Sequence, residues 1–144
     1  MKKLAFIIVI AVLIYGYAQE QGISLSNLVT FSSGTDSTLQ EAYRNHQSNI
    51  QIQGKGTVAR VLPDDLEGSR HQKFILRLST GQTLAVAHNI DLAPRVSGLK
   101  SGDTVEFFGE YEWNSKGGVI HWTHDDPNNI HIGGWLKHQG RTYN

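Results

Sequence analysis

Apolar and polar residues alternate along most of the chain after Ile50, the pattern of strands with one buried face. The first alternating segment is long, contains Gly54 and Gly56, and shifts its period near Val58. These are features of a strongly bent strand with a bulge. In all, the alternation predicts five strands, over 50–62, 73–78, 83–88, 105–113 and 119–123.

Two other segments complete the predicted architecture. A helical pattern runs from Ser37 to near Ser48, with Leu39 and Tyr43 on one face, and predicts a brace across the end of the strands. The connection 89–99 contains a proline, and its apolar spacing predicts one helical turn between the third and fourth strands.

This order of elements predicts an all-β fold. The expected domain is a small five-stranded OB-like Greek-key barrel with a short N-terminal helix and an irregular, histidine-rich C-terminal segment. A small antiparallel sandwich is the alternative architecture.

The N-terminus has the pattern of a secretory signal peptide. Lys2 and Lys3 precede the uncharged apolar run 4–15, and Gly16-Tyr17-Ala18 places small residues two apart. The run is shorter than the roughly 20 residues that span a bilayer, so we expect cleavage after Ala18 rather than an uncleaved anchor. We therefore expect a periplasmic or secreted protein without stable membrane insertion after cleavage. The domains expected are a signal peptide (1–18), a linker (19–36) and a single OB-like domain (37–144).

Composition limits the partners and the metal ligands. The 144 residues contain 13 basic and 13 acidic side chains, so no overall field favours nucleic acid or an anionic membrane. Cysteine is absent, so a metal would have to bind His, Asp or Glu.

The residues suited to site chemistry concentrate between Gly117 and His138, which holds four of the seven histidines and two of the three tryptophans. A turn at Thr123 would bring the ligand-type side chains together. The predicted metal site, suited to a divalent ion such as zinc, consists of His121, His124, Asp126 and His131. The alternative is that these histidines only hold an irregular segment in place.

The same segment allows a catalytic hypothesis. His121 would act as a general base and Asp125 or Asp126 would orient it, as in a metal-dependent phosphodiesterase or nuclease. Arg70 or Lys137 would stabilise the charge that develops on the phosphate. The sequence contains no nucleophile elbow, phosphate loop or zinc-protease helix motif, so whether the protein is an enzyme stays open.

A binding hypothesis uses the outer surface of the predicted barrel. OB barrels bind oligonucleotides or oligosaccharides on their second and third strands and flanking loops. The glutamates that alternate along 105–113 argue against a broad nucleic-acid track, and a solvated face is their alternative role. The candidate ligand-binding residues are Lys73, Arg77, His88, Asn89, Trp135 and His138.

Four segments of the chain carry a resemblance. The four segments are RVLPDDLEGSRHQKFIL, HNIDLAPRV, GDTVEFFGEYEWNSKGGVIHWTHDDP and GGWLKHQGRTY. They resemble bacterial domain of unknown function family 3465, a family of short secreted proteins with an HWTH(H/D)DP motif. The resemblance implies a small OB-like domain in the cell envelope. It implies no activity, substrate or catalytic residue.

Three functional hypotheses follow. The first is a secreted or periplasmic OB-like protein with a metal-assisted, histidine-rich site for an oligonucleotide, oligosaccharide or other phosphate-bearing ligand. The second is a metal-dependent phosphodiesterase or nuclease. The third is a structural or interaction protein of the cell envelope.

Overall fold

The structure, a computed structural model, describes residues 31–144. The expected signal peptide and residues 19–30 of the expected linker lie outside the described residues. Within 31–144 the elements are α3 (Phe31–Arg44), β1 (Ile50–Val61), β2 (His71–Arg77), β3 (Thr83–Asn89), β4 (Thr104–Glu112), β5 (Val119–His121), β6 (Trp135–His138) and β7 (Arg141–Tyr143). Across these residues no helix has both the length and the apolar character needed to cross a membrane.

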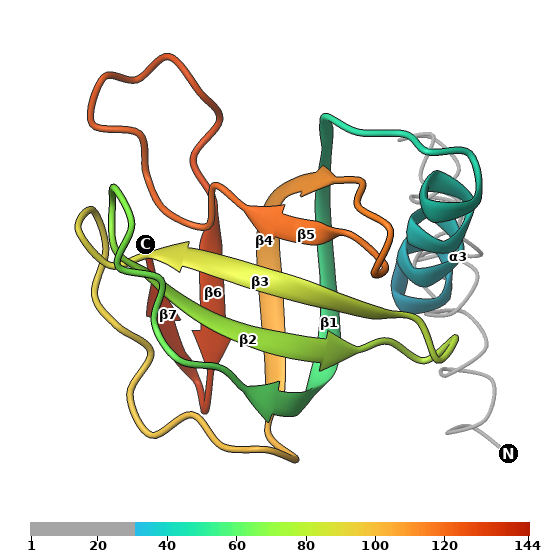
Figure 1. The fold of residues 1–144 in the computed structure, drawn as a ribbon, viewed down its shortest axis with the longest axis horizontal. Helices are drawn as coiled ribbons and strands as arrows, with labels where there is room; N and C mark the ends of the chain where they lie inside the picture. The colour runs from blue at the N-terminus through green and yellow to red at the C-terminus, as the bar shows by residue number, and fades with distance from the viewer. Residues whose placement is uncertain (1–30) are drawn as a thin grey trace, which may run out of the picture. The chain divides into compact units, whose positions relative to one another are not determined.

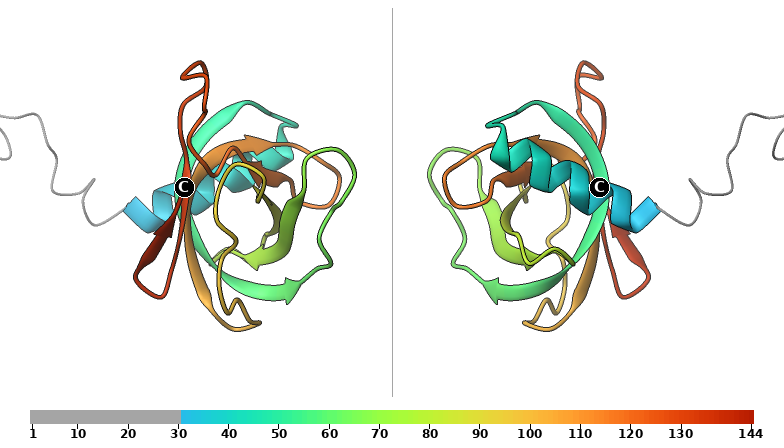
Figure 2. Two further views of the ribbon diagram at one scale, coloured as in Figure 1. Left: turned by 90° about the vertical axis from the view of Figure 1, so that its left-hand side faces the viewer. Right: turned by 90° about the vertical axis from the view of Figure 1, so that its right-hand side faces the viewer.

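Five of the strands close a barrel. Their order is β1-β2-β3-β5-β4, and β4 pairs back with β1 (Figure 1). β3 and β5 run parallel, whereas the other neighbours are antiparallel. Figure 2 shows the strands as a ring. The predicted all-β, OB-like Greek-key barrel is confirmed, and the sandwich is excluded.

The bend in β1 lets one strand serve two neighbours. Residues 50–57 pair with β4 and residues 57–61 with β2, and the register shifts between Val58 and Arg60. A Cβ atom on Gly56 would lie 2.9 Å from the backbone oxygen of Arg77, so this crossing requires glycine. The register shift confirms the predicted bulge.

The barrel interior follows from the alternation. Leu76, Val86, Phe107 and Ile120 are fully buried, each from a different strand. The inward row includes Tyr111, whose hydroxyl donates to the Gly117 oxygen at 3.0 Å. These residues belong to one continuous core, to which β1, β6 and β7 also contribute buried side chains.

The helix packs on this core, as expected. Leu39 is fully buried in the core cluster, and the Trp113 Nε1–H donates to the Tyr43 backbone oxygen at 3.0 Å. The helix begins at Phe31 and ends at Arg44, earlier at both ends than the predicted 37–48. The last described residues of the expected linker, 31–36, are therefore helical.

Of two further connections, one is as expected and one differs. The segment after β3 contains the expected helical turn, closed by the hydrogen bond from Ala93 N–H to the Asn89 backbone oxygen at 3.1 Å. The C-terminal segment is irregular only over 122–134, because β6 and β7 form a hairpin after it. Gln139 and Gly140 both have positive φ, 50° and 77°, which suits a two-residue hairpin turn.

Candidate functional site

The candidate site lies on the outer face of β4. Val105, Phe107 and Tyr111 point into the core, so Glu110 and Glu112 project outward with the opposite parity. β5 pairs with this part of β4 and places His121 directly opposite Glu110. The pairing of two strands therefore brings two carboxylates and one imidazole to the same patch of surface.

The three side chains form a compact donor set. Their ligand atoms lie within 4.8 Å of one another, and the His121 Nε2 is 3.5 Å from the Glu112 Oε1 and 4.0 Å from the Glu110 Oε2. Donors around one tetrahedral zinc ion, with bonds of about 2.0–2.2 Å, are separated by roughly 3.4 Å. The spacing and the mixture of oxygen and nitrogen donors therefore fit a divalent ion.

The His121 Nε2 has an unusual environment. It is shielded from solvent and makes no hydrogen bond, although the imidazole as a whole is 32% exposed. The nearby carboxylate of Glu112 is within ion-pair distance but outside hydrogen-bonding geometry. A shielded nitrogen without a partner is uncommon in native structures, and a bound ion is one of the explanations.

A fourth side chain, His131, completes this cluster from the loop 122–134. Its Nε2 lies 2.6 Å from the Glu110 Oε2, and its Nδ1 lies 2.8 Å from the Ile132 oxygen. Burial acts to lower the pKa of His131, but the hydrogen bonds to Ile132 and Glu110 and the charges of Glu110 and Asp126 outweigh it, so the pKa is raised. The raised pKa favours the protonated imidazole, and the Nε2–Oε2 contact holds and orients the Glu110 carboxylate.

The loop is an excursion from one edge of β4. β5 pairs with residues 110–112 and β6 with residues 105–108 along that same edge, so residues 122–134 leave and rejoin it (Figure 1). The chain turns at Trp122, whose φ is 55°, one residue before the predicted turn at Thr123. At the neck of the loop, Gly134 N–H donates to the His124 oxygen at 2.9 Å.

Inside the loop, aromatic and backbone contacts fix His131. The ring of Trp122 stacks on the His131 imidazole at 3.9 Å between centroids and 8° between planes. The Asp126 carboxylate accepts the backbone N–H groups of residues 128, 130 and 131, and these hydrogen bonds lower the pKa of Asp126. Asp126 therefore acts as the internal cap of the loop.

The structure does not bring the four predicted metal ligands together as one donor set. His124 is 4% exposed and its Nδ1 donates to the Asp125 backbone oxygen at 2.7 Å. The Asp126 carboxylate accepts hydrogen bonds from the loop backbone. His121 belongs to the donor set, and His131 lies beside it through Glu110. In residues 31–144, the set with closely spaced donor atoms is Glu110, Glu112 and His121.

A hollow of about 210 Å³ adjoins His121. It lies where β2 begins and where β3 and β5 end, and the side chains that line it carry imidazole, amide, indole and aliphatic groups. Its lining consists of His71, Ala87, Asn89, Leu92, His121, Trp122 and His124.

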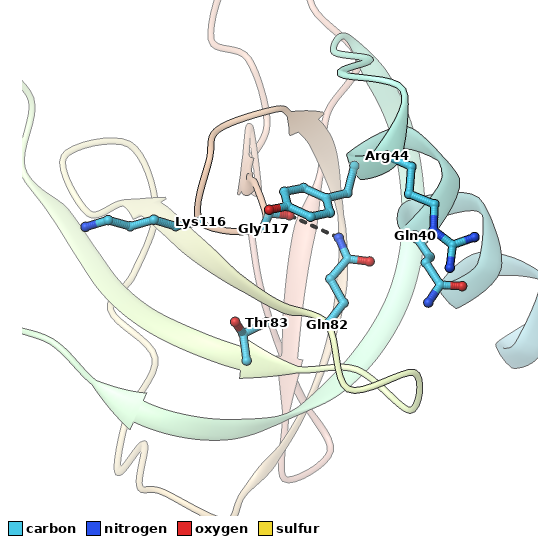
Figure 3. Close-up of a pocket in the computed structure, with 7 residues that line it drawn as sticks. Gln40, Arg44, Gln82, Thr83, Lys116 and Gly117 are labelled. Atoms are coloured by element: carbon cyan, nitrogen blue, oxygen red, sulfur yellow. Dashed lines mark hydrogen bonds between the residues drawn. The ribbon is translucent and has the colours of Figure 1, made fainter.

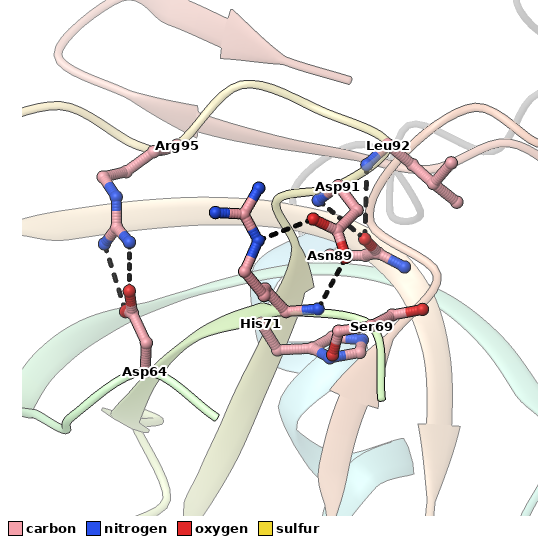
Figure 4. A network of polar contacts seen from close by, with 8 residues as sticks. Asp64, Ser69, His71, Asn89, Asp91, Leu92 and Arg95 are labelled. Carbon is pink, nitrogen blue, oxygen red and sulfur yellow. Dashed lines mark hydrogen bonds and ion pairs between the residues drawn. The ribbon is translucent and has the colours of Figure 1, made fainter. Parts of the chain in front are cut away.

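A polar network fixes the rim of this hollow (Figure 4). Asn89 Oδ1 accepts the N–H groups of Asp91 and Leu92, at 2.9 and 3.2 Å. Arg70 binds Asp91 through its backbone N–H and its Nε–H, at 2.8 and 2.7 Å, and these bonds lower the pKa of Asp91. Because the side-chain oxygen of Asn89 accepts two backbone N–H groups, only the side-chain N–H groups of Asn89 are left for a ligand.

Two predicted ligand-binding histidines are interior side chains. His88 is fully buried, with Nε2 2.9 Å from the Pro94 oxygen and Nδ1 2.7 Å from the Thr123 hydroxyl. His138 is 2% exposed and its Nε2 lies 2.8 Å from the Asp103 Oδ2, a hydrogen bond that lowers the pKa of Asp103. Both imidazoles connect strands to loops from within.

The other predicted site residues lie on the surface. Lys73 and Arg77 project from the outer face of β2. Trp135 pairs with Phe108 across β6 and β4, with ring centroids 6.3 Å apart, and Lys137 lies 5.7 Å above it. Asp125, the predicted partner of a catalytic base, is exposed, whereas His121 faces the two glutamates.

Sequence reasoning missed Glu110, Glu112 and His71 as site residues. The glutamates alternate with buried aromatics, which indicated a solvated face, but Glu110 is only 15% exposed because His131 covers it. The strand register across the turn between β4 and β5 could have predicted this site, because it pairs Glu110 with His121.

Comparison with known protein families identifies one family. The model of the family described as "Protein of unknown function (DUF3465)" matches residues 22–144. No curated protein matches the chain.

Proposed function

Because the chain belongs to the DUF3465 family of proteins of unknown function, its chemistry has to be inferred from its own residues, and we propose a metal-assisted ligand-binding role. The protein is a secreted or periplasmic OB-like domain. Glu110, Glu112 and His121 hold a divalent ion such as zinc, and the hollow beside them receives the ligand. The observation that carries the proposal is the His121 Nε2, which is shielded from solvent and makes no hydrogen bond although it lies next to two carboxylates.

His121 links the metal to the ligand. It belongs to the donor set and also lines the hollow, so an ion bound there would lie next to a ligand in the hollow. Three protein ligands leave a fourth position of a zinc ion open. A ligand oxygen in that position would be bound by the ion and by neighbouring imidazole and amide groups.

The charge balance favours a phosphate-bearing ligand over a neutral sugar. Without an ion, Glu110 and Glu112 would repel a phosphate group, whereas a divalent ion between them would attract one. The hollow of about 210 Å³ is below the usual range for whole small-molecule sites, so it suits one phosphate-containing unit of a longer ligand such as an oligonucleotide.

Binding measurements with labelled ligands test this function. We expect a short oligonucleotide to bind wild-type protein in zinc, and to lose binding in chelator and in His121→Ala. Glu106→Gln is the matched control, because Glu106 lies on the same face of β4 outside the donor set. Zinc-independent binding of the oligonucleotide, or binding of a neutral oligosaccharide instead, would contradict the proposal.

The open metal position also supports a second candidate, the metal-dependent phosphodiesterase. Water in that position would be acidified by the ion and could attack a phosphodiester held in the hollow. Turnover of a chromogenic phosphodiester that requires zinc and His121 would establish hydrolysis. A protein that neither binds zinc nor turns over substrate, but captures an envelope partner, would fit the third, structural role.

The secreted location rests on the N-terminal pattern. Lys2 and Lys3, the apolar run 4–15 and the small residues before Gln19 favour export and cleavage. N-terminal sequencing of protein from the envelope fraction should begin at Gln19. An intact Met1 on membrane-embedded protein would contradict it.

A further inference from the structure

A second hollow lies on another part of the domain, between the helix and the barrel. Its volume is about 350 Å³, within the range of small-molecule sites. Three segments form it: the end of α3, the start of β3 and the loop before β5. The lining residues are Gln40, Tyr43, Arg44, Gln82, Thr83, Lys116 and Gly117 (Figure 3).

Hydrogen bonds between these segments hold the hollow in shape. Gln82 Nε2 donates to the Gly117 oxygen at 3.0 Å and to the Leu39 oxygen at 3.3 Å, so one amide joins the loop and the helix. The Tyr43 hydroxyl donates to the Ser115 oxygen at 3.1 Å. The first contact links the turn before β3 to the helix and to the loop before β5, and the second links the helix to that loop. The hollow is therefore formed without a ligand.

Close packing at Gly117 adds to this rigidity. Its φ is 109°, and a Cβ atom there would overlap the Thr83 backbone oxygen. Glycine is therefore required for the loop to approach the start of β3 this closely. The position of the loop at Gly117 relative to the start of β3 is thus fixed by a backbone contact.

The charges around the hollow have one sign. Arg44 and Lys116 are exposed and lie on opposite sides of Gln82 in Figure 3. Among the ion pairs of the described residues neither cation has a partner, and no carboxylate lines the hollow. The neutral lining groups, two amides and two hydroxyls, suit hydrogen bonds to a polar ligand.

We propose that this hollow binds a small anion carrying a carboxylate or phosphate group together with hydroxyls, such as a uronic acid or a sugar phosphate. Arg44 binds the anionic group, and the Gln40 amide, the Gln82 Oε1 and the Thr83 hydroxyl face the hydroxyls. Lys116, on the other side of Gln82, adds positive charge at the rim. This site is independent of the metal-assisted site, because none of its lining residues belongs to the donor set Glu110, Glu112 and His121. Basic side chains attract the anion here, whereas a bound ion would attract the phosphate at the metal-assisted site.

Calorimetric titration of wild-type protein with glucuronate, glucose 6-phosphate and uncharged glucose tests the proposal. We expect one site for at least one of the two anions, no binding of glucose, and weaker binding at high salt. Arg44→Gln should weaken binding about tenfold, the effect of losing one charge-assisted hydrogen bond. Lys116→Gln should weaken binding less, because Lys116 contributes positive charge at the rim rather than a direct contact. Lys55→Gln, which removes an exposed cation from β1 outside the hollow, should leave affinity unchanged.

Two results would overturn the proposal. One is the absence of saturable binding by both anions. The other is equal affinity in the Lys55→Gln control and in the Arg44→Gln/Lys116→Gln double variant, which would show non-specific attraction. Affinity should also be unchanged by chelator and by His121→Ala, so loss of binding under those conditions would assign the anion to the metal-assisted site instead.

Discussion

The His131 Nε2 lies 2.6 Å from the Glu110 Oε2, and this contact joins the loop 122–134 to the outer face of β4 across 21 positions of sequence. The loop carries its own internal cap, the Asp126 carboxylate, and a stack between Trp122 and His131. His131 therefore does two things: it fastens the loop and orients a carboxylate of the candidate metal site.

This contact predicts a defined pH dependence. The pKa of His131 is raised in the folded protein, so its contribution to stability is fully present below the unfolded value of about 6.5 and is lost as pH rises through the folded pKa. Urea unfolding should show a stability difference between wild type and His131→Gln that shrinks from pH 6 to pH 9. Glu110→Gln should reduce this dependence, while the hydrogen bond to Ile132 and the charge of Asp126 preserve part of it. A difference that does not change with pH would contradict the ion pair.

His88 predicts the opposite response. Burial lowers its pKa, and its two nitrogens are engaged by the Pro94 oxygen and the Thr123 hydroxyl, so the folded state keeps it neutral. The unfolded chain takes up a proton below about pH 6.5, and the folded state loses stability as pH falls from there towards the folded pKa. His88→Gln should be less stable than wild type at pH 7 but lose less stability between pH 6.5 and 5. An unchanged slope would mean that His88 does not control this response.

The neck of the loop predicts a contrast between adjacent glycines. A Cβ atom on Gly134 would overlap the backbone oxygens of Trp122 and Phe108, neither of which can move freely. A Cβ atom on Gly133 would lie 2.8 Å from the Asp125 Oδ1, the end of an exposed side chain that can rotate away. Gly134→Ala should therefore lower the melting temperature clearly and Gly133→Ala only slightly. Equal effects would contradict the geometry of the neck.

The barrel could be predicted from sequence because its strands have one buried face each. Alternation placed Phe107 and Tyr111 inside, and the slip at Val58 marked the bulge of β1. The C-terminal hairpin was missed because β6 and β7 have only four and three residues, too short for a periodic pattern.

The candidate site was harder to predict, for a physical reason. Asp and His side chains in a turn bind their own loop backbone as readily as a metal, and Asp126 and His124 do so here. Glu110 enters the site because strand register places it opposite His121 and because the loop returns His131 to it. Neither relationship can be deduced from the spacing of the residues along the sequence.

The most direct test of the metal-assisted site is calorimetric titration of chelator-treated protein with zinc at pH 7. We expect one site per chain, loss of measurable binding in His121→Ala, and unchanged binding in Glu106→Gln. His131→Gln should bind about 10–100-fold more weakly, the usual effect of removing a group that orients a metal ligand. Wild-type protein that binds no zinc, or His121→Ala protein that binds it as tightly as wild type, would contradict the account.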